Sequence, residues 1–187
     1  MNFNTLAKKR ASIKEFSSKK PPIEKIMEAI ETANLAPSPG NLGIIRYLII
    51  ENPKTIDKIA NACQQSFISK APFVVVICSD SSQPKRLYGS RADTYIKQHA
   101  GAVIQNFLLK ITDLKLVSCW VGAFSKETLN NLLNIPDDIE IEAILPIGYQ
   151  PIYNKTKQKI KPSTENRIYF EFYRNKHKKP YRKIGDH

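Results

Sequence analysis

Apolar residues recur every three or four positions along residues 100–114, and this spacing predicts one face of a helix. The positions are Ala100, Val103, Ile104, Phe107, Leu108, Ile111 and Leu114. Ala102 and Leu109 widen the face, so we expect the helix to be buried over most of its circumference. Residues 116–121 then form a short run of β-branched and aromatic residues that ends at Gly122, which is typical of an inner strand.

The rest of the chain alternates between helical and strand patterns. We expect strands at 44–51, 73–79 and 140–149, and the continuous apolar run 73–79 is typical of the centre of a sheet. We expect a helix over 22–36, and the residues that would face the core are Ile23, Ile26, Met27, Ile30 and Ala33. Asn52 and Ser125 are predicted to cap two more helices. Residues 81–95 are polar and are predicted to be a loop or short helices, forming a lid over a pocket. These elements predict one α+β domain.

The composition adds few constraints. With 187 residues and 42% hydrophobic residues, the chain is long enough for one well-buried domain. No apolar run approaches the roughly 18 residues that cross a bilayer, and the polar N-terminus does not resemble a signal peptide. The three cysteines show no metal-ligand spacing, which favours reduced, buried thiols in a cytoplasmic protein.

The net charge of +12 is concentrated at the C-terminus. Residues 155–187 hold 11 Lys and Arg against three Asp and Glu, a net charge of +8. Aromatic residues are interleaved with these cations, which suits stacking on a single-stranded nucleic acid. An arm that packs its aromatic residues on a partner subunit would look the same. No recognised nucleic-acid motif is present, so we favour the arm.

Arg10, Ser12 and Lys14 alternate along the first informative segment. In an extended chain the three side chains would project to one side, and two cations with a hydroxyl group can hold a phosphate. Ser12 and Glu15 also match a capping box, so a helix N-terminus at Ser12 is the alternative.

Four motifs, taken in order, resemble the nitroreductase family of FMN-dependent oxidoreductases. They are the Arg10–Phe16 segment (Arg-x-Ser-x-Lys-x-Phe), the loop PSPGN at 37–41, the runs QNFLL at 105–109 and SCWVGAF at 118–124, and PIGY at 146–149. The chain departs from the family pattern in places. Lys14 replaces an Arg, Gly43-Ile44-Ile45 replaces Gln-Pro-Trp, Lys115-Leu116-Val117 replaces Gly-Leu-Gly, and Gln150 replaces a Pro.

The resemblance implies an α+β fold with a mixed, mainly antiparallel sheet surrounded by helices. It also implies an obligate homodimer with FMN at the subunit interface. Residues 1–154 would form the FMN-binding domain, and residues 155–187 a basic C-terminal arm that completes the same domain and packs on the partner subunit. Neither a membrane nor a nucleic acid is expected as a partner.

The resemblance also assigns cofactor-binding residues. Arg10, Ser12, Lys159 and Lys161 would hold the phosphate, and Lys14 would approach the N1/C2 edge of the flavin. The loop residues Pro37, Ser38 and Asn41 would meet the ring or the ribityl chain, and backbone amides near Val121 and Gly122 would face N5. No residue is predicted to be a catalytic acid or a metal ligand.

The function implied is ping-pong transfer of electrons from NADH or NADPH through FMN to a small-molecule acceptor, a nitroaromatic compound or a quinone. A flavoenzyme of the same fold with different chemistry, such as reductive dehalogenation or flavin breakdown, is an alternative. A non-catalytic module that binds nucleic acid through the basic C-terminus is a third reading.

Overall fold

The computed structural model describes residues 1–152 and 163–176, together with all their side chains except that of Glu165. Its contacts divide the chain into two compact units, Met1–Asn154 and Lys155–His187. The predicted phosphate ligands Lys159 and Lys161 lie outside the described residues.

The first unit is built on a four-stranded antiparallel sheet in the order β1-β2-β4-β3. The strands are β1 (Ile45–Ile50), β2 (Phe73–Asp80), β3 (Val117–Ser118) and β4 (Ile139–Gly148). The apolar run predicted for the centre of the sheet is β2, which pairs with β1 on one side and β4 on the other. The predicted strand 116–121 is shorter than expected, because only β3 pairs regularly and Val121 makes an isolated pair with Ile144.

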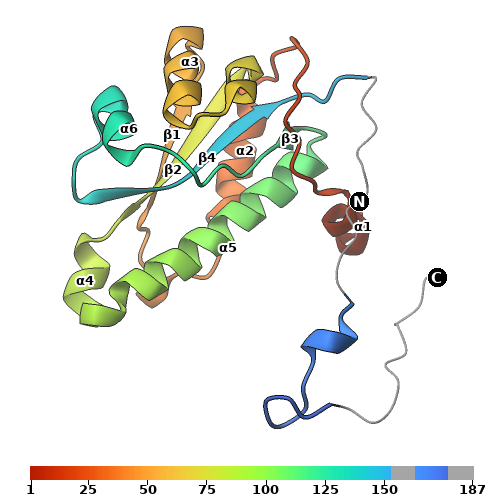
Figure 1. The fold of residues 1–187 in the computed structure, drawn as a ribbon, viewed down its shortest axis with the longest axis vertical. Coiled ribbons are helices and arrows are strands. Elements are labelled where there is room, and N and C mark those ends of the chain that lie inside the picture. The colour runs from red at the N-terminus through yellow and green to blue at the C-terminus, as the bar shows by residue number, and fades with distance from the viewer. Residues whose placement is uncertain (153–162, 177–187) are drawn as a thin grey trace. The chain divides into compact units, whose positions relative to one another are not determined.

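Helices cover both faces of this sheet (Figure 1). On one face, α2 (Ile23–Ala33) and α5 (Ala92–Asp113) pack against one another and on Val75, Ile77, Leu145 and Ile147. On the other face, α3 (Pro53–Ala62) and α6 (Lys126–Leu133) enclose a second cluster, which we call the α3-side core. The α3-side core comprises Ile56, Ile59, Ala60, Cys63, Ile68, Val74, Val76, Cys78, Val121, Leu129, Ile135, Ile141 and Ile144.

The long apolar helix is α5, and it begins earlier than the hydrophobic pattern indicated. Its 22 residues start at Ala92, so the end of the polar segment 81–95 is helical. The remainder of that segment forms α4 (Ser82–Tyr88) and the 3-10 turn η3 (Gly89–Arg91). Within α4 only Pro84 is buried, which explains why an apolar pattern did not reveal this helix.

The predicted helix caps are confirmed, but part of the predicted burial is wrong. Asn52 accepts hydrogen bonds from the backbone N–H groups of Lys54 and Thr55, and Ser125 accepts one from Thr128. In α2, however, Ile23 and Met27 are 43% and 46% exposed. Only Ile26, Ala29 and Ala33 are buried there, so the inward stripe is narrower than predicted.

The chain begins with α1 (Phe3–Lys9), which the sequence pattern did not predict, and it has no buried residue. The three cysteines are buried free thiols, as expected. Burial raises the pKa of Cys63 to about 11 and that of Cys78 to about 12, so both are protonated at neutral pH. Across the described ranges, no helix is long and apolar enough to cross a membrane.

The second unit contains a short loop of aromatic and basic residues. A 3-10 turn, η4 (Glu165–Arg167), precedes it, and Phe170 and Asn175 close it through hydrogen bonds. The Tyr169 and Tyr173 ring centroids lie 4.9 Å apart. Lys176 and Arg174 lie over these rings, at 4.6 Å from Tyr169 and 5.6 Å from Tyr173.

Candidate functional site

The segment that contains Arg10, Ser12 and Lys14 lies along the edge of the sheet beside β3. Ser12 pairs with Ser118 in the parallel direction, and the Ile13 N–H donates to the Ser118 carbonyl oxygen over 3.0 Å. Arg10 ends α1, and its N–H donates to the Leu6 carbonyl oxygen. The chain is therefore extended after Arg10, and the alternative of a helix that begins at Ser12 is wrong.

The Lys14 side chain contacts an aromatic ring. Its Nζ lies 4.9 Å from the centroid of Phe67, which belongs to the 3-10 turn η2 (Ser66–Lys70) after α3. Phe67 is half-buried and packs against the α3-side core, which includes Val121. Lys14 thus lies over a ring that packs on the same core as the Val121 side chain.

Val121 and Gly122 follow β3 along the chain. Val121 is buried, whereas Gly122 is exposed. The Val121 side chain is 2% exposed, and its backbone exchanges two hydrogen bonds of 3.0 Å with Ile144. Gly122 is exposed, and a Cβ atom added to it would have no neighbour within 4 Å. In this chain, therefore, nothing crowds Gly122, and a flat ligand could approach its backbone closely.

A buried hydroxyl group lies in the strand beside Ser12. Ser118 is 4% exposed, and its Oγ has no hydrogen-bond partner among the described residues. An unsatisfied buried polar atom is uncommon and calls for a physical reason. The exposed Ser12, the two cations that flank it in sequence and the uncrowded Gly122 are residue types that fit an anionic, flat cofactor such as FMN.

The loop that carries Pro37, Ser38 and Asn41 lies elsewhere. It folds into the 3-10 turn η1 (Pro39–Asn41), where Gly40 has φ +59° and Asn41 has φ +57°. A Cβ on Gly40 would come within 2.6 Å of the Tyr88 hydroxyl oxygen at the end of α4, so a side chain there would displace Tyr88, and the positive φ favours glycine. Tyr88 in turn packs edge-to-face on Tyr95 in the first turns of α5, at 5.2 Å between ring centroids.

The two groups of predicted residues consequently lie at opposite ends of α5. The loop 37–41 adjoins Tyr88, which precedes the start of the helix, whereas Ser12 pairs with Ser118, five residues beyond its end at Asp113. Figure 1 shows α1 at the β3 end of α5. At 1.5 Å per residue, the 22 residues of α5 span about 33 Å. The two groups are therefore separated along much of the length of α5.

His99 is a buried polar residue within α5. It is 7% exposed, and its Nδ1 has no hydrogen-bond partner in the described part of the chain. Burial lowers the pKa of His99, so the ring is neutral at physiological pH.

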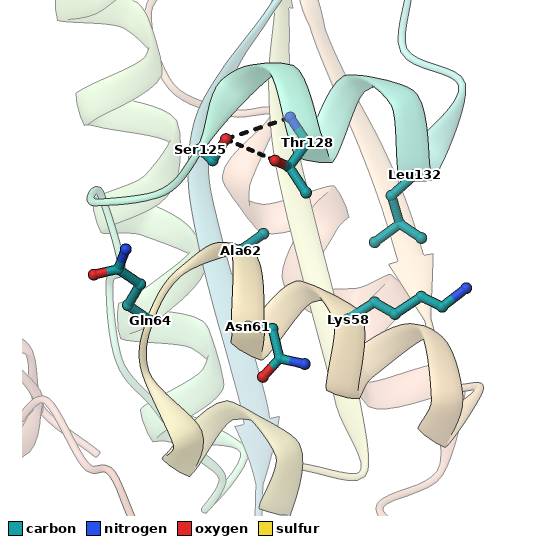
Figure 2. Close-up of a pocket in the computed structure, with 7 residues that line it drawn as sticks. All are labelled: Lys58, Asn61, Ala62, Gln64, Ser125, Thr128 and Leu132. Carbon is teal, nitrogen blue, oxygen red and sulfur yellow. Dashed lines mark hydrogen bonds between the residues drawn. The ribbon is translucent and has the colours of Figure 1, made fainter.

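A separate pocket of about 460 Å³ opens between α3 and α6, on the face of the sheet opposite α5 (Figure 2). It is lined by Lys58, Asn61, Ala62, Gln64, Ser125, Thr128 and Leu132. None of the predicted cofactor-binding residues is among them, so this pocket is distinct from both groups. No set of three or more His, Cys, Asp or Glu side chains in the described residues could hold a metal ion.

A comparison with protein families shows what this architecture is. The model of the nitroreductase family matches residues 7–70 and 61–149, which together make up most of the chain. The chain belongs to the nitroreductase family. The family assignment and the fold expected from the four sequence motifs are thereby confirmed.

Individual relatives span more than one chemistry. An iodotyrosine deiodinase from Thermotoga neapolitana is 26% identical over 170 residues, which cover 77% of this chain and 86% of the relative. A Streptococcus pyogenes protein named "Putative NAD(P)H nitroreductase Spy0809" is 28% identical over 180 residues, covering 80% and 90%. An FMN-dependent nitroreductase from Clostridium difficile R20291 has the same fold, with a TM-score of 0.76, 20% identity and coverage of 90% and 98%.

The sequence did not reveal the functional interest of Phe67. The helix that Asn52 caps, α3, ends at Ala62, and Phe67 lies beyond it on η2. The ring meets a lysine 53 positions earlier in the chain. No local spacing could indicate that contact.

Proposed function

We propose that this protein is an FMN-dependent oxidoreductase that takes electrons from NADH or NADPH and passes them to a nitroaromatic or quinone-type acceptor. Membership of the nitroreductase family supports an oxidoreductase. The FMN-dependent structural neighbour and the relative named for NAD(P)H support the cofactor and the donor. The observation that supports particular residues is the extended segment after Arg10, in which Ser12 pairs with Ser118 in β3, shortly before the chain reaches Val121 and the uncrowded Gly122.

In this proposal the chain binds and orients the cofactor. Arg10 and Ser12 would hold the phosphate group through charge-assisted hydrogen bonds. Lys159 and Lys161 would add positive charge. The ammonium group of Lys14 would lie at the N1/C2 edge, where a fixed cation favours negative charge. FMN, when bound, supplies the transfer of two electrons between NAD(P)H and the acceptor. The proposal assigns no catalytic acid.

The complete site requires a second copy of the chain. Because Pro37, Ser38 and Asn41 lie at the opposite end of α5 from Lys14, one chain supplies only one side of a flavin pocket. A twofold axis that sets two α5 helices antiparallel would bring the loop of one chain to the edge of the other. Ile23 and Met27, which are exposed in the single chain, also suit burial at such an interface.

Steady-state kinetics test the activity. We expect the purified protein loaded with FMN to oxidise NADH or NADPH only when a quinone or nitroaromatic acceptor is present. Double-reciprocal plots at several acceptor concentrations should be parallel, because donor and acceptor would occupy the same face of the flavin in turn. An FMN-loaded protein that oxidises neither nucleotide with any acceptor would refute the proposal.

Hybrid dimers test the shared site. One chain would carry Arg10→Ala with Lys14→Met, and the other Ser38→Ala with Asn41→Ala. Neither homodimer should bind FMN tightly, but a mixed dimer contains one intact site and should recover about one FMN per two chains. If mixing restores nothing while dimers form, each flavin is held by a single chain and the shared site is wrong.

Reductive deiodination is a second candidate, and the iodotyrosine deiodinase relative supports it. The two candidates differ in the acceptor alone. Turnover with iodotyrosine or a halogenated phenol, measured as release of halide, should exceed turnover with a nitroaromatic compound at equal concentration if this second candidate is correct.

A further inference from the structure

Lys14 contacts an aromatic ring and, among the described residues, no acidic side chain. Its Nζ lies 4.9 Å from the Phe67 centroid, and no ion pair in the described ranges involves it. Lys20 provides a contrast. Its Nζ also lies over a ring, 4.7 Å from the Phe73 centroid, but it forms a 2.7 Å ion pair with Glu51. The positive charge of Lys14 is therefore available to a ligand in a way that the charge of Lys20 is not.

The Phe67 ring is half-buried and packs against the α3-side core, which also holds the Val121 side chain. The next residue, Ile68, is fully buried, and Cys63 at the end of α3 is 4% exposed. The ring and the Val121 side chain therefore pack on one core.

The Lys14 backbone is fixed, because the preceding residue donates its N–H to the Ser118 carbonyl oxygen. The remaining freedom lies in the four rotatable bonds of the exposed lysine side chain. A lysine loses considerable rotamer entropy when a ligand immobilises it. A ring face that already attracts the ammonium group reduces that loss.

We propose that Phe67 is a positioning residue for the flavin site: its ring face holds the Lys14 ammonium group at the place where the electron-rich edge of the flavin binds. The inference rests on the proposed binding of FMN beside β3. An arginine presents a rigid, planar fork, whereas a lysine is a point charge on a flexible stem. Phe67 supplies the orientation that the lysine at position 14 lacks.

A double-mutant cycle on the full-length protein, stripped of any cofactor and titrated with FMN, separates positioning from packing. Phe67→Leu removes the ring face and keeps an apolar side chain. With Lys14 present, we expect this change to raise the Kd for FMN about two- to fivefold, the range for a cation–π contact at an exposed site. In a Lys14→Met background, the same change should alter the Kd by less than about 1.5-fold, because no cation remains to position.

Two controls accompany the cycle. Phe124 is half-buried and packs against the same α3-side core, so Phe124→Leu controls for the loss of an aromatic ring from that core. Lys19 lies 5.3 Å from the Tyr149 centroid, so Lys19→Met controls for the loss of one surface charge over a ring. Phe124→Leu should show no coupling to Lys14→Met, and Lys19→Met should show no coupling to Phe67→Leu. Phe67→Tyr keeps the ring face and should retain the wild-type Kd.

The redox potential of the bound flavin is a second measurement. A cation held at the N1/C2 edge stabilises the reduced, anionic form, so Phe67→Leu should lower the midpoint potential in the Lys14 background and leave it unchanged in Lys14→Met. If Phe67→Leu does not fold, Phe67→Met replaces it in both measurements as another apolar side chain without a ring.

The outcomes distinguish the inference from the proposed function. Equal effects of Phe67→Leu in both backgrounds, or no effect in either, overturn the positioning role while FMN binding stands. A wild-type protein that does not bind FMN overturns the proposed function and the positioning role together.

Discussion

Substitution of Gly122 tests the proposed flavin site, because the fold has room for a side chain there whereas a bound flavin would leave none. A Cβ at Gly122 would meet no atom within 4 Å, so the chain itself has room for a side chain. Gly148, at the end of β4, is the opposite case. A Cβ there would lie 2.9 Å from the Pro72 Cδ and 3.1 Å from the Phe16 Cδ1. Substitutions at the two glycines should therefore separate ligand binding from folding.

We expect Gly122→Val to change the free energy of unfolding of the FMN-free protein by no more than about 0.5 kcal/mol, as for an uncrowded surface position. If the flavin lies against this backbone, the valine side chain overlaps it. Forcing extra carbon atoms into a packed contact costs about 1–3 kcal/mol, which corresponds to roughly a 5- to 150-fold increase in the Kd for FMN.

Gly148→Ala should do the reverse. Its overpacking of about 1–3 kcal/mol should lower the melting temperature by roughly 2–12 °C and leave the Kd for FMN of the folded protein near the wild-type value. Thermal unfolding of the FMN-free protein and quenching of FMN fluorescence measure the two quantities on the same samples. A Gly122→Val protein that binds FMN within twofold of wild type would show that the flavin does not approach this backbone.

Three further predictions concern single side chains. Lys14→Met should raise the Kd for FMN about fivefold. Lys14→Arg should keep the Kd within twofold of wild type, because arginine retains the charge and can stack on Phe67. Equal losses of affinity in the two variants would contradict a role for the charge. Asn52→Ala removes the cap of α3 and should lower stability by about 1 kcal/mol, or 2–4 °C in melting temperature, with no change in FMN binding; a flavin-dependent loss would be unexpected. Burial lowers the pKa of His99 in the folded protein, so the unfolded chain binds the proton more tightly than the folded protein does. The contribution of neutral His99 to the free energy of unfolding should therefore be fully present above the ordinary pKa of about 6.5. It should be lost as the pH falls through the lower pKa of the folded protein. His99→Asn should reduce this dependence in melting curves from pH 7.5 to 5, and an unchanged slope would exclude His99 as its source.

Much of the fold could be predicted because its elements carry local signals. Asn52 and Ser125 cap the helices that they were expected to cap, and the apolar run 73–79 lies in β2 at the centre of the sheet. These predictions depend on neighbouring residues alone. They succeed because cap chemistry and hydrophobic periodicity act over a few residues.

The predictions that failed concern features that local sequence patterns do not report. The α1 helix, which the pattern did not predict, buries nothing, so it leaves no apolar stripe in the sequence. Ile23 and Met27 were assigned inward because their spacing fits a helical face, but that face extends beyond what one chain covers. Periodicity reports which residues avoid water, and it does not report whether the same chain or another one covers them.

In the candidate site, too, local features could be predicted from the sequence and contacts between distant segments could not. Alternation predicted that Arg10, Ser12 and Lys14 form an extended segment, and Ser12 does pair with Ser118. The contact of Lys14 with Phe67 depends on how η2 packs against the α3-side core. Such a contact is visible only in three dimensions.

The most direct test of the account is the visible absorption spectrum of the purified protein, before and after NADH or NADPH is added without oxygen. We predict a flavin spectrum, either as purified or after FMN is added, that bleaches with one of the nucleotides and returns when a quinone or nitroaromatic acceptor is admitted. A colourless protein that does not take up FMN would contradict the account at its centre.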